Sequence, residues 1–260
     1  MLTVLSPAKS LDYESPLATS KSSEPRLLDQ ASELVEVLAK KSPRSLKQMM
    51  GISSDLAELN HERFQEWEVP FPEGSARPSI LAFNGDVYLG LDVGSFNQRD
   101  FTYSQKVLRI LSGLYGVLRP LDLMMPYRLE MGSKLKTRKG KDLYSFWGST
   151  ITDVLNADLA ASPGEKVLVN LASNEYFKSV RPGELDAPVV SPAFLDAKGD
   201  GDFRTVSFFA KKARGSMAAW LVRERITDVD QLPKFDGMGY AHDADRSTDE
   251  RPVFTRRNPA

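Results

Sequence analysis

Short apolar runs alternate with amphipathic stretches along this chain, and this alternation is the feature that most limits its fold. Apolar runs at residues 2–5, 80–83, 107–111 and 167–169 each lead into small or polar residues, as buried strands do where they enter loops. Apolar residues recur every three or four positions from Glu24 to Lys41, which predicts an amphipathic helix. Strands that alternate with helices predict a mixed α/β fold, in which a mixed sheet is covered by helices.

The later part of the chain predicts further elements of the same domain. The turn-forming residues 198–202 predict a β-hairpin between two strands, and a helix from Ser216 to Arg225 is expected to follow. The polar tail after Gly239 is expected to pack loosely. No repeat or low-complexity linker divides the chain, so we expect a single compact domain over residues 1–260.

Cysteine and histidine content exclude several kinds of site. The chain has no cysteine, which excludes disulfides, thiolate catalysis and cysteine-ligated metals. Its two histidines, His61 and His242, are too few for a histidine-rich metal site. We therefore predict no metal and no cofactor.

The distribution of apolar residues bears on location. No apolar run reaches the length of about 18 residues that a membrane-spanning helix needs, and the first residues lack the cationic and apolar regions of a signal peptide. The sequence predicts a cytoplasmic protein that makes no membrane contact.

Clustered cations are the strongest indication of a partner. The formal net charge is only −1, so an anion could be attracted by local clusters alone. One cluster, 134–141, includes Lys139, and a second comprises Lys211, Lys212 and Arg214, predicted to lie just before a helix. Cations at a helix N-terminus are unfavourable because they oppose the helix dipole. A bound phosphate would interact favourably with both the cations and the free N–H groups. The clusters predict a polyanionic partner, with nucleic acid as the leading candidate, although a charged run can also be simply a solvated face.

Residues 43–66 read as two short helices that meet at Gly51. The spacing resembles a helix-hairpin-helix, in which the turn offers backbone N–H groups to a DNA phosphate without reading sequence. Gly51 and Ala57 match that motif, whereas Ser53 replaces its second glycine and Asp55 places a carboxylate beside the turn.

Polar residues that follow the predicted strands could form a ligand cleft, because open α/β sheets bind ligands beyond the carboxyl ends of their strands. An enzyme acting on a nucleotide or damaged base could use Lys9, Tyr88, Tyr115 and Lys178 as catalytic candidates, although no catalytic motif is present. The full set of such residues is Ser6, Lys9, Asn84, Asp86, Tyr88, Ser112, Tyr115, Arg119, Ser173, Asn174, Tyr176 and Lys178.

Five blocks of sequence together resemble the YaaA family of peroxide stress resistance proteins. They are SPAKSLDY, FNGDVYLGL, LSGLYGVLRPLDLMMPYRLEMG, NLASNEYFKSV and SFFAKKARGSMA, in family order over nearly the whole chain. The resemblance implies a compact mixed α/β fold, resistance to peroxide stress with lowered free iron, and DNA binding through a basic cleft and a helix-hairpin-helix. It implies DNA contacts at Gly51, Ile52, Ser53, Lys211, Lys212 and Arg214.

Three functions remain open at this point. The leading hypothesis is a sequence-tolerant DNA-binding protein that protects damaged DNA or aids its repair, on duplex or branched DNA. The second is the enzyme described above, and the third is a stress factor that binds other proteins.

Overall fold

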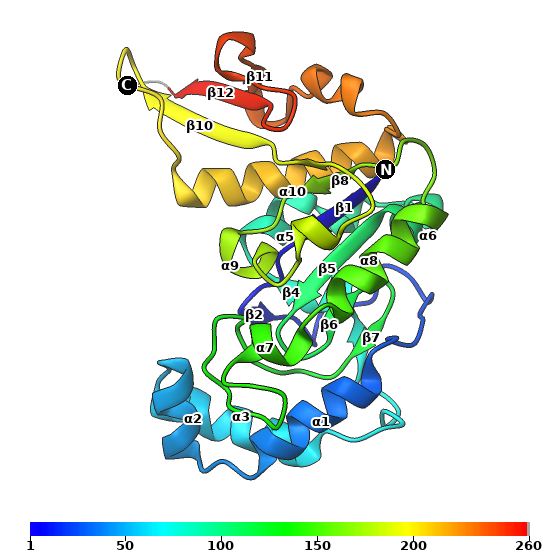
Figure 1. The fold of residues 1–260 in the computed structure, drawn as a ribbon, viewed down its shortest axis with the longest axis vertical. Helices are drawn as coiled ribbons and strands as arrows, with labels where there is room; N and C mark the ends of the chain where they lie inside the picture. Colours follow the sequence, from blue (N-terminus) through cyan, green and yellow to red (C-terminus); the bar gives the residue numbers. More distant parts are fainter. Residues whose placement is uncertain (259–260) are drawn as a thin grey trace.

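A five-stranded sheet lies at the centre of the molecule, in the order β6–β5–β1–β8–β9 (Figure 1). The computed structural model describes residues 1–258. β1 pairs in parallel with both β5 and β8, β8 pairs in parallel with β9, and β6 is an antiparallel edge strand. The strands are β1 (Leu2–Leu5), β5 (Leu108–Ser112), β6 (Gly116–Leu118), β8 (Leu168–Asn170) and β9 (Val189–Val190).

Helices pack against this sheet, as its apolar strands require. Every residue of β1 and β5 is buried, which is typical of parallel strands covered on both faces. The helices in contact with the sheet are α6 (Gln98–Val107), α8 (Thr150–Ala161), α9 (Asn174–Phe177) and α10 (Ser207–Arg223). The predicted mixed α/β fold, with helices covering a mixed sheet, is confirmed.

The lower end of the molecule in Figure 1 is helical. It contains α1 (Leu28–Ala39), α2 (Pro43–Met50), α3 (Ser54–Glu66) and α7 (Leu143–Trp147). Short elements lie next to the sheet: the ribbon β2 (Ser10–Leu11) with β4 (Phe83–Asn84), the ribbon β3 (Arg77–Pro78) with β7 (Leu123–Met124), and α4 (Ser79–Ala82). The helix α5 (Asp86–Leu91) packs against α10 (Figure 1).

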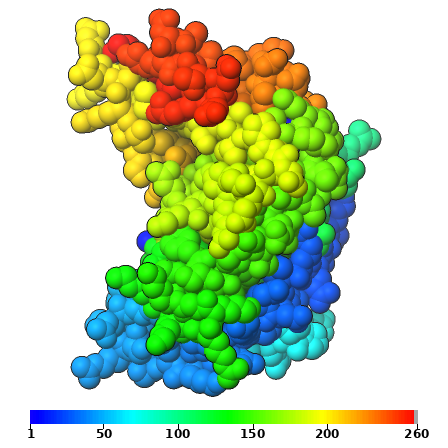
Figure 2. Space-filling model, viewed as in Figure 1, coloured from blue at the N-terminus to red at the C-terminus, as the bar shows by residue number. Residues whose placement is uncertain are grey.

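The upper end carries a second sheet, in the order β10–β12–β11, above α10 (Figure 1). Its strands are β10 (Ala193–Lys198), β11 (Ala241–His242) and β12 (Val253–Asn258). Short 3₁₀ helices complete the described elements: η1 (Val93–Ser95), η2 (Pro182–Glu184), η3 (Val229–Lys234), η4 (Gly237–Gly239) and η5 (Ala244–Arg246). Figure 2 shows a hollow in the surface below this end, between the yellow residues near the start of α10 and the green segment beneath them.

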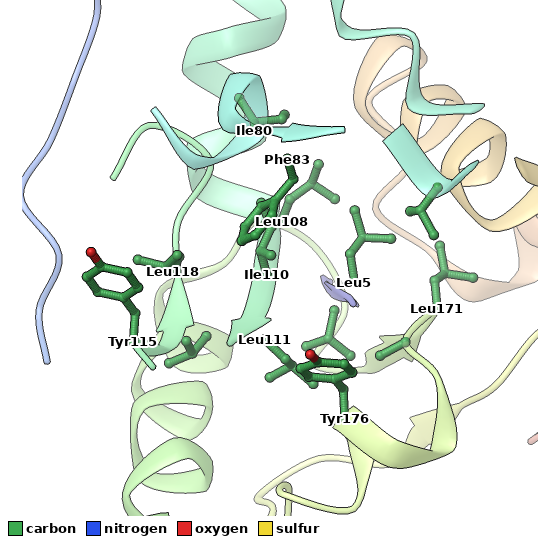
Figure 3. Close-up of a cluster of buried hydrophobic side chains, with 14 of the residues drawn as sticks. Leu5, Ile80, Phe83, Leu108, Ile110, Leu111, Tyr115, Leu118, Leu171 and Tyr176 are labelled. Atoms are coloured by element: carbon green, nitrogen blue, oxygen red, sulfur yellow. The ribbon is translucent and has the colours of Figure 1, made fainter. Parts of the chain in front are cut away.

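The core is continuous from the sheet into both ends. Figure 3 shows side chains of β1 and β5, among them Leu5, Ile110 and Leu111, packed with Phe83 and Tyr176. Residues of α1 and of β12 belong to the same cluster of buried apolar side chains. No helix of residues 1–258 is both long enough and apolar enough to span a membrane.

Several sequence-based boundaries are wrong. The late hairpin does not form, because residue Arg204 makes one bridge to Asp196 and the chain then enters α10 at Ser207; the regular partner of β10 is β12, in parallel. Consequently α10 begins nine residues before the predicted Ser216, and its alanines, lysines and arginine are good helix formers. The tail after Gly239 supplies β11 and β12 and is therefore not loose.

Two earlier segments also differ from expectation. The predicted helix from Glu24 to Lys41 is shorter, from Leu28 to Ala39. Residues 79–82 form the short helix α4 rather than the start of a strand, because the backbone amides of Ser79 and Ile80 donate to the carbonyls of Asp122 and Pro120.

Candidate functional site

The carboxyl ends of β1 and β8 lie side by side, and the residues that follow them touch. The Ser6 hydroxyl, just after β1, accepts a hydrogen bond of 2.8 Å from the backbone amide of Ser173 and lies 3.3 Å from its hydroxyl. Parallel pairing of the two strands brings these serines together from positions 167 residues apart. The strand-end region is thus built from distant parts of the sequence, as an open α/β sheet predicts.

A cleft of about 540 Å³ opens at this edge, and we call it the strand-end cleft. It corresponds to the hollowed side of the molecule in Figure 2. Six of the residues predicted from strand ends line it: Ser6, Lys9, Asn84, Asp86, Ser173 and Tyr176. The remaining lining comes from the loop after β1, from α5, from the start of α9, and from Glu130, Leu171, Lys211 and Arg214.

The strand-end cleft has equal numbers of cations and carboxylates, but they do not all form ion pairs. Three cations line it, as do three carboxylates, those of Asp86, Glu130 and Glu175. Lys9 pairs with Glu130 at 2.7 Å and Lys211 approaches Asp86 at 4.0 Å. Arg214 has no carboxylate oxygen of residues 1–258 within 4.0 Å.

Arg214 is therefore a half-buried cation without a partner. Its guanidinium makes no hydrogen bond within residues 1–258, and burial lowers its pKa from the ordinary value. A charge that is withheld from water without compensation is unfavourable. The cleft thus holds one guanidinium, with donors in a planar fork, that is available to an anionic ligand.

Two glycines position this cation by allowing α10 to lie directly on α5. A Cβ atom on Gly215 would lie 1.8 Å from the carbonyl oxygen of Val87, and one on Gly90 would lie 2.0 Å from that of Lys212. The two helix backbones are consequently in contact. This contact places Lys211 and Arg214, from the first half of α10, beside the start of α5 at the cleft.

The cations of α10 occupy a different position from the one the sequence predicted. They lie inside the helix, beyond its first turn, so the argument from the helix dipole does not apply to them. Lys211 and Arg214 line the strand-end cleft, whereas Lys212 lies with its ammonium group 4.4 Å from the ring centre of Phe208.

The predicted catalytic candidates do not gather in the cleft. Tyr88 is buried and donates to the Ser6 carbonyl at 3.1 Å, and burial raises its pKa well above the ordinary value. Burial also raises the pKa of Tyr115, whose hydroxyl accepts from the Trp67 indole and the Met125 amide. The exposed Lys178 lies over the ring of Tyr144. Of the four candidates, Lys9 lines the cleft.

The predicted hairpin contacts lie on another part of the molecule. α2 and α3 are at the bottom of Figure 1, well below α10. The break at Gly51 is confirmed, since this residue adopts the left-handed conformation that ends α2. The amides of Gly51 and Ile52 both donate to the Lys47 carbonyl, while the Ser53 hydroxyl caps α3. A helix pair with this turn does not by itself confirm a DNA-binding helix-hairpin-helix.

Lys139 lies outside the strand-end cleft as well. Its ammonium group pairs with Glu33 of α1 at 2.8 Å and lies 4.5 Å from the ring centre of Phe146. The structure therefore separates the residues predicted to bind nucleic acid into three places: α10, from which Lys211 and Arg214 line the cleft, the turn between α2 and α3, and the Lys139 loop.

Two carboxylates of the cleft were missed by sequence reasoning. Glu175 lies in α9, the first helix after β8, within the segment SNEYF, so the strand-end rule could have found it. Its carboxylate accepts a hydrogen bond of 2.9 Å from the Gly132 amide. Glu130 lies in an irregular segment that gave no such indication. Within residues 1–258, no group of three or more His, Asp or Glu side chains is placed to hold a metal ion.

Comparison with known proteins identifies the family. Residues 1–246 match the family model described as peroxide stress protein YaaA. A protein of Saccharophagus degradans named UPF0246 protein is 51% identical over 257 residues, which cover 99% of this chain and 100% of that protein. The five sequence blocks that suggested the resemblance lie within the matched region. The chain therefore belongs to the family of peroxide stress protein YaaA.

Proposed function

We propose that this chain serves the response to peroxide stress by binding DNA, with a backbone phosphate held by Arg214 in the strand-end cleft. The role in oxidative stress follows from the family. The observation that best supports the DNA contact is the half-buried guanidinium of Arg214, which has no carboxylate partner among residues 1–258. Such a contact would protect damaged DNA or aid its repair.

A phosphate is a well-matched ligand for this guanidinium. Two phosphate oxygens can accept parallel hydrogen bonds from the planar fork, and such charge-assisted bonds are stronger than neutral ones. A hydrogen bond to a charged group contributes about 1.5–3 kcal/mol, which corresponds to about tenfold to a hundredfold in affinity. Phosphates carry no sequence information, so this binding would tolerate any DNA sequence.

The charge balance of the cleft limits how many phosphates it can neutralise. Lys9 and Lys211 already have carboxylates near them, and the whole chain has a formal net charge of −1. We expect about two or three phosphate contacts in all, which gives a slope of about −2 to −3 for log affinity against log salt concentration.

Two further places are expected to contact DNA: the turn between α2 and α3, and the Lys139 loop. Arg44 and Lys47 lie beside a hollow of about 230 Å³ at that turn, near Gly51, Ile52 and Ser53. Glu58 lines the same hollow and Glu33 pairs with Lys139, so these sites are less basic than the sequence suggests. We expect each of them to contribute less than Arg214.

The first test removes the cationic side chains of α10. Arg214→Gln is expected to weaken binding of a labelled DNA oligonucleotide about tenfold or more, since the phosphate loses its charged donor. Adding Lys211→Gln and Lys212→Gln should weaken it further and reduce the salt slope. Fluorescence anisotropy titrations at several salt concentrations measure both quantities.

Two matched variants control this test. Arg223→Gln removes the same charge from the other end of α10, where Arg223 pairs with Asp92, and should leave the affinity nearly unchanged. Ser53→Asp keeps a good helix cap but adds a negative charge at the α2–α3 turn, so it weakens binding only if that turn contacts DNA. Equal affinities of the Arg214→Gln and wild-type proteins would rule out the strand-end cleft as the DNA site.

An enzyme that acts on a nucleotide or a damaged base is the second candidate. It is favoured by the carboxylates of Glu130 and Glu175, which line the same cleft as Arg214 and are typical general acids and bases. If DNA or a nucleotide is converted, Glu175→Gln should lower the rate about 100-fold or more while keeping the acceptor for the Gly132 amide. Chromatography of reaction mixtures would measure product formation by the wild-type and Glu175→Gln proteins. If the wild-type protein forms no product, this candidate is excluded.

A further inference from the structure

Four aromatic side chains form a series inside the core that begins at the strand-end cleft. Tyr176 lines this cleft, and it lines a second, much smaller cavity together with Tyr127. The ring centres of Tyr127 and Tyr115 lie 5.4 Å apart, and those of Tyr115 and Trp67 lie 6.4 Å apart. Figure 3 shows Tyr115 and Tyr176 within one cluster of buried side chains. We call these four residues the tyrosine–tryptophan series.

Hydrogen bonds hold the rings of this series in position. The Trp67 indole donates to the Tyr115 hydroxyl at 2.9 Å, and the Met125 amide donates to the same hydroxyl at 3.1 Å. The Tyr127 hydroxyl lies 2.6 Å from that of Ser112, which also accepts from the Tyr115 amide. Burial raises the pKa of Tyr115 and of Tyr127 above the ordinary value, so both phenols remain protonated. The spacing between neighbouring rings is therefore fixed by the fold.

Packing alone does not require these residue types. The aromatic cluster at the upper end of the molecule centres on three phenylalanines, Phe194, Phe235 and Phe254. A phenylalanine ring fills nearly the same space as a tyrosine ring, and it brings no hydroxyl that must find a partner inside the core. Tyrosine and tryptophan differ from phenylalanine in their chemistry, because both can give one electron to a strong oxidant and take it back. The series therefore consists throughout of side chains that can be oxidised and reduced reversibly.

The two ends of the series meet different surroundings. Tyr176 faces the strand-end cleft, whereas Trp67 directly follows α3. Trp67 is 8% exposed and Tyr115 is 1% exposed, so Trp67 touches solvent and the ring behind it does not. Electrons tunnel between closely spaced rings without any contact between the first ring and the last. An electron supplied to Trp67 from solution can thus reach the cleft in three short steps.

We propose that this series carries an electron from Trp67 to Tyr176 and so removes one-electron oxidants from the strand-end cleft. Hydrogen peroxide that gains one electron yields a hydroxyl radical and hydroxide. A hydroxyl radical at the cleft takes the phenolic hydrogen atom of Tyr176, which forms water and a tyrosyl radical. Tyr127 and Tyr115 then relay one electron from Trp67 to this radical. The activity suits a protein of the peroxide stress family and is independent of DNA binding.

Atoms and electrons balance over the whole sequence of steps. The Tyr176 phenolate that the relayed electron produces takes a proton from water in the cleft. The oxidised Trp67 indole keeps its Nε1 proton, because that proton is bonded to the Tyr115 phenol, which is a poor base. A small-molecule thiol then gives one electron to Trp67 and releases its own proton to water. In sum, one hydroxyl radical and one thiol become one water molecule and one thiyl radical.

The test starts the reaction from the cleft. The chain has no cysteine, so Lys9→Cys provides a single attachment point for a ruthenium polypyridyl photo-oxidant. The Lys9 side chain is 62% exposed and lines the small cavity shared by Tyr176 and Tyr127. A light flash with a soluble quencher converts the complex into a one-electron oxidant, and transient absorption distinguishes tyrosyl from tryptophan radicals. A tyrosyl signal should appear first, and a tryptophan signal should replace it.

Three substitutions in the labelled protein interrupt the series. Tyr115→Phe and Tyr127→Phe each replace a relay by a ring that cannot be oxidised in this way. The tryptophan signal should therefore be lost in both variants, while the tyrosyl signal should last longer. Trp67→Phe should also abolish the tryptophan signal, although Trp147 and Trp220 remain in the chain.

A matched variant and an added reductant complete the test. Tyr240→Phe also removes a buried phenolic hydroxyl, one that donates to Asp196 outside the series, and should leave both signals unchanged. A small thiol in solution should shorten the lifetime of the tryptophan signal in the otherwise unchanged labelled protein.

Several results would overturn this inference. They are a tryptophan signal that persists in both Tyr115→Phe and Tyr127→Phe, one that persists in Trp67→Phe, absence of that signal from the labelled protein without further substitution, or a lifetime that thiol does not change. None of them affects the DNA affinity expected for Arg214→Gln, so the inference and the proposed function fail separately. Thermal melting checks folding; Tyr127→Phe leaves the hydrogen bonds of the Tyr115 hydroxyl intact and decides the matter if Tyr115→Phe does not fold.

Discussion

Replacing Gly215 by alanine is expected to lower the free energy of unfolding by about 3 kcal/mol or more, the upper part of the range for overpacking. The new Cβ atom would lie 1.8 Å from the Val87 carbonyl oxygen and 2.7 Å from the Leu91 amide nitrogen. Both are backbone atoms of α5 and cannot rotate away as a side chain could. The helices would have to separate, and urea unfolding followed by circular dichroism would measure the loss.

Gly183→Ala is the matched control for this substitution. A Cβ atom there meets nothing within 4 Å, and Gly183 lacks a positive φ, so the change in stability should stay within about 0.5 kcal/mol. Because α10 carries Lys211 and Arg214, any folded Gly215→Ala protein should also bind DNA more weakly. A Gly215→Ala protein as stable as the Gly183→Ala protein would show that α5 and α10 are not in backbone contact.

The contact between α5 and α10 also shows which parts of the fold a sequence can reveal. A glycine in a helix interior costs about 1 kcal/mol relative to alanine, so Gly215 within SFFAKKARGSMA implies a reason in packing. The sequence could not identify the partner, because Gly90 lies in α5, more than a hundred residues earlier. The start of α10 was misplaced for a related reason. Residues 198–202 resemble a hairpin turn, which predicts a second strand paired with β10. In the structure only one bridge forms there, between Asp196 and Arg204.

The location of the candidate site could be predicted from the sequence, but the role of each residue could not. Ser6 and Ser173 follow apolar runs, and parallel pairing of β1 with β8 brings them to one edge of the sheet. Asn84 reaches the same cleft through the antiparallel ribbon β2–β4. Tyr88 and Tyr115 also follow apolar runs, yet both side chains are buried in the core, where their hydroxyls form hydrogen bonds with other core residues. Position after a strand does not tell which way a side chain points.

The pairing of charges was beyond sequence reasoning altogether. Lys139 and Arg214 look alike in the sequence, since each lies in a run of cations. In the fold, Lys139 meets Glu33 of α1, whereas Arg214 meets no carboxylate of residues 1–258. Such partners come from segments that only the tertiary structure brings together, so the structure was needed to separate Arg214 from Lys139 among the cations that the sequence had already named.

Loss of the Asp158 carboxylate is expected to destabilise the protein by about 3–5 kcal/mol, because it leaves a buried arginine without its partner. Asp158 of α8 contacts Arg109 of β5 at 2.5 Å and Arg26 at 2.8 Å. The Arg109 side chain is only 5% exposed, so it cannot turn to solvent when the carboxylate is removed, whereas Arg26 at 31% can. Chemical unfolding of Asp158→Asn measures the effect, with the exposed Asp153→Asn of the same helix as control.

The pH dependence of this difference provides a second, independent check. Burial by itself raises the pKa of Asp158, but hydrogen bonds and charges from Arg109 and Arg26 outweigh it, so the pKa lies below the ordinary value. A carboxyl with a depressed pKa stabilises the fold above its unfolded pKa of about 3.9, and that stabilisation is lost as pH falls through the folded pKa. The gap in stability between wild-type and Asp158→Asn proteins should thus be constant from about pH 6 to 8 and narrow below about pH 4. A gap that widened on acidification would mean that Asp158 is not held ionised by the two arginines.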